Sequence, residues 1–396
     1  MERAYLVAVE VKGKAAAFSS QSSLDELALL ADTAGARVVG RTVQKLEKPN
    51  PATYVGKGKL AELKAQRPEF DYSLVVFDDE LSPTQQRNLE DALAVKVLDR
   101  TALILDIFAR RARTREGRLQ VELAQYQYLL PRLAGQWSHL ERLEGAIGTR
   151  GPGETQLETD RRLVRDRIAR LKREIESVRR QRALYRRRRE RAGVPVVALV
   201  GYTNAGKSTL MSALSGADVF AEDKLFATLD PLTRRVKLSD HRSVLLSDTV
   251  GFIQKLPAQL VAAFRATLEE LSAADVLVHV VDITHPDAAQ QGETVLETLR
   301  DLDLAGKPVV TALNKVDLLS RRDGDPIRGL EELREQRTLL SSEQPDSLLI
   351  SAQSGWGLDE LRQRIELVLE KGSALPAKAA SRFSKPGART ERAEAD

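Results

Sequence analysis

The chain has 396 residues, no cysteine and a formal net charge of +4. This length suits two or three domains, and the lack of thiols excludes disulfides and thiolate metal sites. No uninterrupted apolar run approaches the roughly 20 residues that span a bilayer. The N-terminus opens directly into a strand-like segment and not into a signal peptide. We therefore expect a soluble cytoplasmic protein without a stable attachment to membranes.

Positive charge is concentrated in one segment of the chain. Residues 161–191 hold 15 Arg or Lys and 4 Asp or Glu, a net charge of +11, so the rest of the chain carries −7. One local basic region favours binding to a single polyanionic partner surface over non-specific binding by the whole protein. The alternative interpretation of the same pattern is a solvated helix face.

The first part of the chain alternates between strand-like and helical patterns. A capping box at Ser23–Glu26 predicts the start of one helix, and Ser82–Pro83 predicts the start of another. The strand-like segments are residues 5–11, 36–43, 73–77 and 95–98. Such alternation predicts a small parallel α/β subdomain over residues 1–112.

Two closely spaced glycines and lysines lie between the second and third strand-like segments, in Gly56-Lys57-Gly58-Lys59. This segment could bind phosphate, including that of an adenine nucleotide, but it lacks the spacing of a P-loop. We favour a tight turn that leads into a helix.

Apolar residues at alternating steps of four and three follow, and they predict a long basic helical hairpin, a coiled coil, over residues 113–192. The first series runs from Leu119 to Leu140 and contains Pro131, where we expect a kink or a break. The second series runs from Leu157 to Tyr185. Between them, residues 144–154 are glycine-rich and predict a flexible tip that carries an arginine.

Residues 193–371 return to a regular α/β alternation, which predicts a further α/β domain. Its strand candidates are residues 194–200, 234–238, 243–247, 275–281, 308–313 and 347–350, and its last helix covers 358–370. Residues 372–396 lack apolar periodicity, so we expect a disordered tail.

A phosphate-binding loop stands at the start of this domain. Gly201–Ser208 match the P-loop pattern and lie between an apolar run and a helical pattern. Backbone amides of such a loop cradle phosphate oxygens. Lys207 would meet the β- and γ-phosphates, and the Ser208 hydroxyl is a hard oxygen ligand for Mg²⁺.

Two further strings follow in the order that a guanine-nucleotide site requires. In Asp248-Thr249-Val250-Gly251, Asp248 can hold Mg²⁺ through water and the Gly251 amide can meet the γ-phosphate. In Asn314-Lys315-Val316-Asp317, the carboxylate of Asp317 can accept hydrogen bonds from N1–H and the amino group of guanine. Adenine lacks both donors, so the site predicts GTP and not ATP. Ser351-Ala352-Gln353 supplies the expected backbone contact to the guanine carbonyl.

The switch segment, between Ser215 and Arg235, predicts a second Mg²⁺ ligand, and Phe252 predicts a dependence on a partner. Thr228 and Thr233 both offer a hydroxyl for Mg²⁺, and spacing alone does not choose between them. Phe252 stands where Ras-like enzymes place the glutamine that orients the attacking water. Phenylalanine can neither donate nor accept that bond, so we expect slow intrinsic hydrolysis and a catalytic group that arrives, or is repositioned, on partner binding.

These strings give the predicted site. Lys207 and Gly251 belong to its catalytic set and Ser208 to its metal set, with Asp248 acting through water, and the family resemblance described next adds Thr228 to both sets. The predicted nucleotide-binding residues are Gly201, Tyr202, Thr203, Asn204, Ala205, Gly206, Lys207, Ser208, Thr209, Phe226, Ala227, Thr228, Leu229, Asp230, Asp248, Thr249, Val250, Gly251, Asn314, Lys315, Val316, Asp317, Ser351, Ala352 and Gln353.

Residues 1–371 resemble the HflX family of ribosome-associated GTPases. The resemblance rests on the motifs 201–209, 226–231 and 248–252, on 148–158 with the adjoining 160–162, and on 54–59. It implies an N-terminal α/β subdomain, a helical hairpin and a Ras-like P-loop G domain, with Thr228 as the switch threonine on Mg²⁺. Gln353 departs from the family pattern, because relatives usually carry a small or apolar residue there.

The same resemblance implies a partner. A member of this family binds the 50S subunit and its 23S rRNA, dissociates stalled or idle 70S ribosomes and hydrolyses GTP faster on the ribosome. Off the ribosome we expect a monomer. Two alternatives stay open: a GTPase that assists assembly of the large subunit, and a GTP-gated scaffold or membrane-associated switch.

Overall fold

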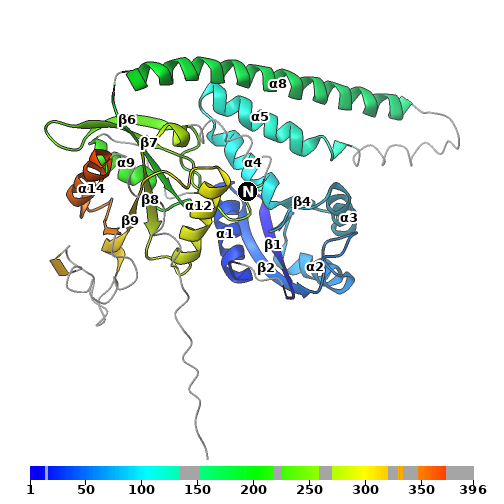
Figure 1. Ribbon diagram of the computed structural model, residues 1–396. Helices are drawn as coiled ribbons and strands as arrows, with labels where there is room; N and C mark the ends of the chain where they lie inside the picture. Colours follow the sequence, from blue (N-terminus) through cyan, green and yellow to red (C-terminus); the bar gives the residue numbers. More distant parts are fainter. Residues whose placement is uncertain are drawn as a thin grey trace, which may run out of the picture.

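The computed structural model divides into an N-terminal sheet domain, a helical arm and a C-terminal sheet domain, in chain order (Figure 1). The residues that the structure describes are 1–13, 17–133, 152–191, 193–216, 225–257, 270–319, 329, 331–332 and 347–371, without the side chains of 152–157, 183 and 185–191. The predicted tail at 372–396 and residues 134–151 lie outside that description. No helix among the described residues is both long and apolar enough to cross a bilayer.

The N-terminal domain is a four-stranded parallel sheet in the order β2-β1-β3-β4. Its strands are β1 (Arg3–Val11), β2 (Arg37–Leu46), β3 (Leu74–Phe77) and β4 (Lys96–Asp99), and its helices are α1 (Ser20–Thr33), α2 (Lys57–Phe70), α3 (Pro83–Leu93) and α4 (Arg100–Arg111). Alternate strand residues face opposite sides of a sheet. Leu6 and Val76 therefore pack against α1 and α4, while Val75 and Phe77 pack against α2 and α3. The predicted parallel α/β subdomain is confirmed.

The predicted capping box at Ser23–Glu26 is wrong. Helix α1 begins earlier, because the Ser19 hydroxyl accepts from the Ser22 amide at 3.0 Å. Ser23 is buried and donates its hydroxyl proton to Asp78, and Glu26 contacts Arg100. Tertiary partners thus engage both side chains that the pattern assigned to a cap. The other predicted cap is confirmed, with Ser82 and Gln85 forming a full capping box.

Helix α2 follows the glycine–lysine segment directly. Gly56 is its N-cap, and Lys59 lies in the first turn, where its ammonium contacts Thr42 and Glu62. The segment therefore forms the turn into a helix that we favoured.

The helical arm consists of α5 (Arg115–Leu129) and the 40-residue α8 (Pro152–Arg191), which pack against each other (Figure 1). Leu171 of α8 is fully buried, as the apolar series predicts. Helix α5 ends just before Pro131, so the predicted break is confirmed. The tip predicted at 144–154 is partly wrong, because α8 already begins at Pro152. Proline suits the first helical position, where no amide hydrogen is needed.

The C-terminal domain is a six-stranded sheet in the order β10-β9-β8-β5-β7-β6, in which only the edge strand β6 runs antiparallel. Its strands are β5 (Val196–Gly201), β6 (Leu232–Lys237), β7 (Ser243–Asp248), β8 (Val276–Asp282), β9 (Val309–Asn314) and β10 (Leu348–Leu349). Its helices are α9 (Lys207–Ser215), α12 (Ala288–Asp301), η1 (Val316–Leu318) and α14 (Leu358–Glu370). All six predicted strands are present. The predicted α/β fold of this domain is therefore confirmed.

One hydrophobic core joins the two sheet domains. Ala198 and Val200 of β5 and Phe252 belong to the same buried cluster as Leu27 of α1 and Phe108 of α4. The edge of the C-terminal sheet that carries the predicted P-loop is thus built against the N-terminal domain and the base of the arm.

Candidate nucleotide-binding site

The predicted P-loop lies where a parallel sheet binds ligands, outside the carboxyl end of β5. The chain leaves β5 at Gly201 and enters α9 at Lys207. Gly206 has a φ of +92°, and a Cβ at this position would lie 2.2 Å from Nδ2 of Asn314. A residue with a side chain would therefore strain the backbone and displace Asn314, which explains the need for glycine here.

Lys207 is almost completely buried inside the loop. Its ammonium donates to the carbonyl oxygens of Gly201 at 3.1 Å and Tyr202 at 2.8 Å. Burial lowers the pKa of Lys207 to about 8, against the opposing effect of the Asp248 carboxylate. A cation held in this position is ready to bind phosphate oxygens.

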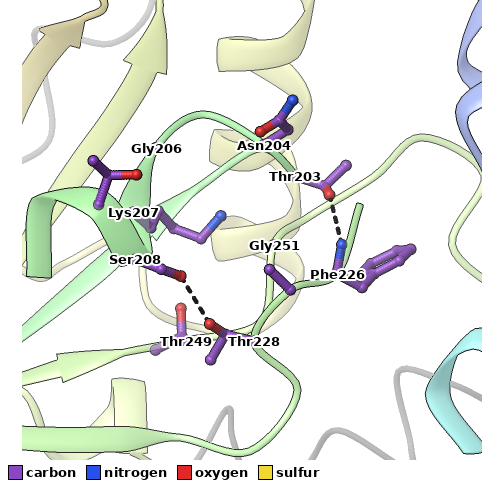
Figure 2. A pocket seen from close by; sticks show the side chains of 11 residues that line it. Thr203, Asn204, Gly206, Lys207, Ser208, Phe226, Thr228, Thr249 and Gly251 are labelled. Atoms are coloured by element: carbon purple, nitrogen blue, oxygen red, sulfur yellow. Dashed lines mark hydrogen bonds between the residues drawn. The ribbon is translucent and has the colours of Figure 1, made fainter. Parts of the chain in front are cut away.

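Three oxygen-bearing side chains converge beside the loop. The Ser208 hydroxyl lies 2.8 Å from the Thr228 hydroxyl (Figure 2). It also donates to Oδ2 of Asp248 at 2.7 Å. The Thr228 hydroxyl donates to the same Oδ2 at 2.9 Å. Thr233, the alternative predicted from sequence, lies in β6 and contacts Ser247 instead.

This group of oxygens fits a Mg²⁺ ion. Asp248 is fully buried, and its Oδ1 accepts no hydrogen bond from any part of the chain that the structure describes. Burial raises the pKa of Asp248, and Lys207 and the two hydroxyls oppose that rise. A buried carboxylate oxygen next to two hydroxyls is a hard donor set, of the kind that Mg²⁺ prefers.

Only part of the predicted switch segment faces the pocket. The Phe226 amide donates to the Thr203 hydroxyl at 3.2 Å, which holds the start of the segment against the P-loop (Figure 2). Leu229 is buried in the shared core, and Asp230 contacts the start of α5. The described residues that line the pocket are Thr203, Asn204, Gly206, Lys207, Ser208, Thr209, Phe226, Ala227, Thr228, Thr249 and Gly251.

The side predicted to bind the base is assembled around Asn314. Its Nδ2 donates to the Ala205 carbonyl at 2.9 Å, and its Oδ1 accepts from the Ala352 amide at 3.0 Å. One side chain at the end of β9 therefore ties the P-loop to the segment after β10. Asp317 follows in η1, and Lys315 forms an ion pair with Asp282 at 2.7 Å. The structure thus brings together motifs that are more than 100 residues apart in the chain.

Sequence reasoning missed the contacts that join the N-terminal domain to this site. The Tyr202 hydroxyl donates to Glu26 and accepts from the Gln254 amide at 2.9 Å, so the second P-loop residue faces α1 and not the pocket. Arg100 bridges Glu26 and Asp78, and Lys255 contacts Asp78 as well. A carboxylate at the carboxyl end of a parallel strand, as at Asp78 after β3, was the one available signal.

Comparison with known proteins identifies the family. The GTPase HflX of Lacrimispora saccharolytica is 50% identical to this chain over 368 residues, which cover 93% of this chain and 83% of that protein. The chain belongs to the GTPase HflX family. Members from Caldanaerobacter subterraneus and Escherichia coli are 50% and 45% identical over 370 and 342 residues, covering 93% and 86% of this chain and 81% and 78% of those proteins. The protein is accordingly a P-loop GTPase that binds GTP and GDP and hydrolyses GTP.

Family models match each part of the chain. The "GTP-binding GTPase N-terminal" model matches residues 21–109, the "GTP-binding GTPase Middle Region" model matches 111–189 and the "50S ribosome-binding GTPase" model matches 196–315. Among solved structures, a GTP-binding protein of Sulfolobus solfataricus in complex with GDP is 26% identical. The two align over 94% of this chain and 99% of that one, with a TM-score of 0.46.

Proposed function

We propose that this GTPase binds the 50S ribosomal subunit, dissociates stalled or idle 70S ribosomes and hydrolyses GTP faster when it is bound to the ribosome. The observation that carries this proposal is the charged surface of α8. The description of the matching G-domain family, a 50S ribosome-binding GTPase, supports the choice of partner. Such a partner would place the protein in the cytoplasm.

Helix α8 extends for about 60 Å at 1.5 Å per residue and packs one face against α5. Some of its arginines are held by that packing, such as Arg167, which contacts Glu122 at 2.6 Å. Others are exposed on the remaining faces. These exposed basic residues include Arg162, Arg165, Arg170, Lys172, Arg173 and Arg180. A stiff helix that presents many cations suits the phosphate groups of 23S rRNA.

We assign the roles at the nucleotide as follows. Lys207 holds the β- and γ-phosphates, the Gly251 amide meets the γ-phosphate and Asp317 accepts from the guanine base. Ser208 and Thr228 hold Mg²⁺ directly, while Asp248 acts through water. Bound Mg²⁺ supplies a Lewis acid that neutralises charge on the phosphate oxygens.

The buried position of Phe252 supports a requirement for the ribosome. Its side chain belongs to the core shared with the N-terminal domain, and its carbonyl accepts from the Thr203 amide at 2.7 Å. The phenylalanine side chain cannot orient water, so slow intrinsic hydrolysis is expected until a partner supplies or repositions a catalytic group.

We also propose four functional units: the N-terminal subdomain (1–112), the arm (113–192), the G domain (193–371) and the tail (372–396).

The decisive experiment compares GTP hydrolysis by the full chain alone and with purified 30S, 50S or 70S particles. We expect strong stimulation by 50S and 70S particles and none by 30S. Hydrolysis that is equally fast without particles, or that 50S does not stimulate, would remove the proposal.

Sedimentation then separates splitting from assembly. Splitting predicts that 70S particles disappear when the protein and GTP are added. A factor for large-subunit assembly would leave 70S intact and bind immature 50S particles. Flotation with lipid vesicles in the absence of ribosomes tests the membrane-associated alternative, for which we expect no binding.

A further inference from the structure

The segment that carries Thr228 is anchored from outside the nucleotide pocket. On one side of Thr228, the Phe226 ring meets the Phe108 ring of α4 edge to face at a centroid distance of 4.7 Å. On the other side, the Asp230 carboxylate receives the start of α5. The residues that hold these two anchors lie in α4, the last helix of the N-terminal domain, and at the start of α5 in the arm.

The Asp230 anchor is a helix N-terminus bound to a carboxylate. Oδ2 accepts from the amides of Arg113 and Thr114, each at 2.8 Å, and Oδ1 accepts from the Thr114 hydroxyl. That hydroxyl in turn accepts from the Gly117 amide at 3.0 Å, so Thr114 caps α5. The free amides of a helix N-terminus favour a negative charge.

Gly117 shows how closely the two segments approach. A Cβ at this position would lie 2.2 Å from Oδ1 of Asp230 and 3.2 Å from the Thr114 hydroxyl oxygen. Glycine is therefore required in the first turn of α5 for the carboxylate to reach its donors. This requirement gives a way to disturb the contact without removing any of its hydrogen-bonding groups.

We propose that Asp230 is a positioning residue for GTP hydrolysis, which keeps the Thr228 hydroxyl facing Ser208 and Asp248. The inference rests on the proposed role of Thr228 as a Mg²⁺ ligand. One residue separates Thr228 from each anchor, so a chain fixed at Phe226 and Asp230 leaves Thr228 little freedom. Without the Asp230 anchor, the hydroxyl spends less time beside its partners.

The same contact couples the arm to the nucleotide site. Helix α5 packs along α8, and Arg182 of α8 contacts Glu116 in the first turn of α5 at 2.8 Å. A displacement of α8 is therefore transmitted through α5 to the residues that bind the Asp230 carboxylate. Because coupling between two sites is reciprocal, a nucleotide that fixes Thr228 also stabilises the docked start of α5.

The test uses the full chain without ribosomes and three variants. Asp230→Ala removes all the acceptors, Gly117→Ala pushes the carboxylate away, and Thr114→Ser keeps the hydroxyl as the conservative variant. Arg115→Ala is the matched control, because this exposed residue lies beside the contact but takes no part in it. The readouts are hydrogen exchange of the Phe226 amide in nucleotide-free protein, GDP affinity measured in EDTA, and the Mg²⁺ concentration for half-maximal hydrolysis.

We expect Asp230→Ala and Gly117→Ala to speed exchange at Phe226 about tenfold, the size typical of a lost cap. The Mg²⁺ concentration for half-maximal hydrolysis should rise by a similar factor, while GDP affinity stays within about twofold because the P-loop and Asp317 are intact. Thr114→Ser and Arg115→Ala should match the unaltered chain. The proposal would be overturned if the exchange rate at Phe226 is unchanged in both Gly117→Ala and Asp230→Ala, or if exchange is faster while the Mg²⁺ dependence of hydrolysis is unchanged.

A parallel Thr228→Ala variant separates this inference from the proposed site chemistry. If Thr228→Ala leaves the Mg²⁺ dependence unchanged, the proposed role of Thr228 fails, whatever Asp230→Ala does. If Thr228→Ala raises the Mg²⁺ requirement and Asp230→Ala does not, only the positioning role of Asp230 fails. Failure of 50S to stimulate hydrolysis would affect neither outcome.

Discussion

Arg100 is a buried charge at the joint between the N-terminal and GTPase domains. Its side chain is 2% exposed, and its guanidinium contacts Asp78 at 2.6 Å, Glu26, and the carbonyl of Ser23 at 3.2 Å. It also lies 3.4 Å from the carbonyl of Gln254, three residues after Gly251. We predict that Arg100→Met strongly destabilises the chain.

The magnitude follows from what the substitution leaves behind. Asp78 would stay buried with Lys255 as its remaining cation, and Glu26 would lose its ion-pair partner. Removing one member of a buried, hydrogen-bonded pair costs about 3–5 kcal/mol when the other charge is left uncompensated. Because Lys255 still faces Asp78, we expect a loss at the lower end, about 3 kcal/mol. Arg41→Met is the matched control, since the Arg41–Asp25 pair is exposed and its loss should cost less than about 1 kcal/mol.

The pH dependence gives a second check. Burial disfavours ionisation of Asp78, but Arg100 and Lys255 outweigh burial and hold its pKa below the ordinary value of 3.8. A carboxylate with a lowered folded-state pKa stabilises the fold above its unfolded pKa, and this contribution is lost as the pH falls through the folded value. The stability difference between the unaltered chain and Arg100→Met should therefore be full near neutral pH and shrink below about pH 4.

The assay is urea unfolding followed by circular dichroism, with the free energy of unfolding compared at pH 7 and in steps down to pH 3. Arg100→Met should lower the midpoint far more than Arg41→Met does. Equal, small effects of the two substitutions, or a difference independent of pH, would refute the assignment of Arg100 as a buried, paired charge.

Three further predictions concern the nucleotide and the arm. Asp317→Asn should reverse the base preference from guanine to xanthine by at least about a hundredfold in competition binding, because the amide presents a donor where guanine needs an acceptor. Gly206→Ala should weaken GDP binding by more than about tenfold, whereas Gly216→Ala, with a similar positive φ but open space around it, should leave GDP affinity unchanged. Binding to 50S should fall on the order of a thousandfold between 50 and 200 mM salt if about six phosphates are contacted, as measured by pelleting. A flat salt profile would argue against the exposed face of α8.

The fold class, the nucleotide and the location of the basic arm could all be predicted from the sequence. Each of these depends on residues that are near one another in the chain. The glycines and Lys207 belong to one loop, Asp317 lies three residues after the last residue of β9, and the apolar series of α5 and α8 repeats at helical spacing. Such patterns can be recognised in the sequence because each structural requirement is met by residues that are close together in the chain.

The side chains that support the site from a distance could not be predicted and are known only from the fold. The sequence pattern predicts a helix capping box at Ser23 and Glu26, but in the fold these side chains contact Asp78 and Arg100, which lie much later in the chain. The sequence places Asp230 among the predicted nucleotide-binding residues of the switch segment. In the fold its carboxylate instead binds the start of α5, more than 100 residues earlier in the chain. Buried polar groups take whichever partners the packed chain brings within hydrogen-bond distance. Those partners depend on how the domains pack, which no spacing within a single segment encodes.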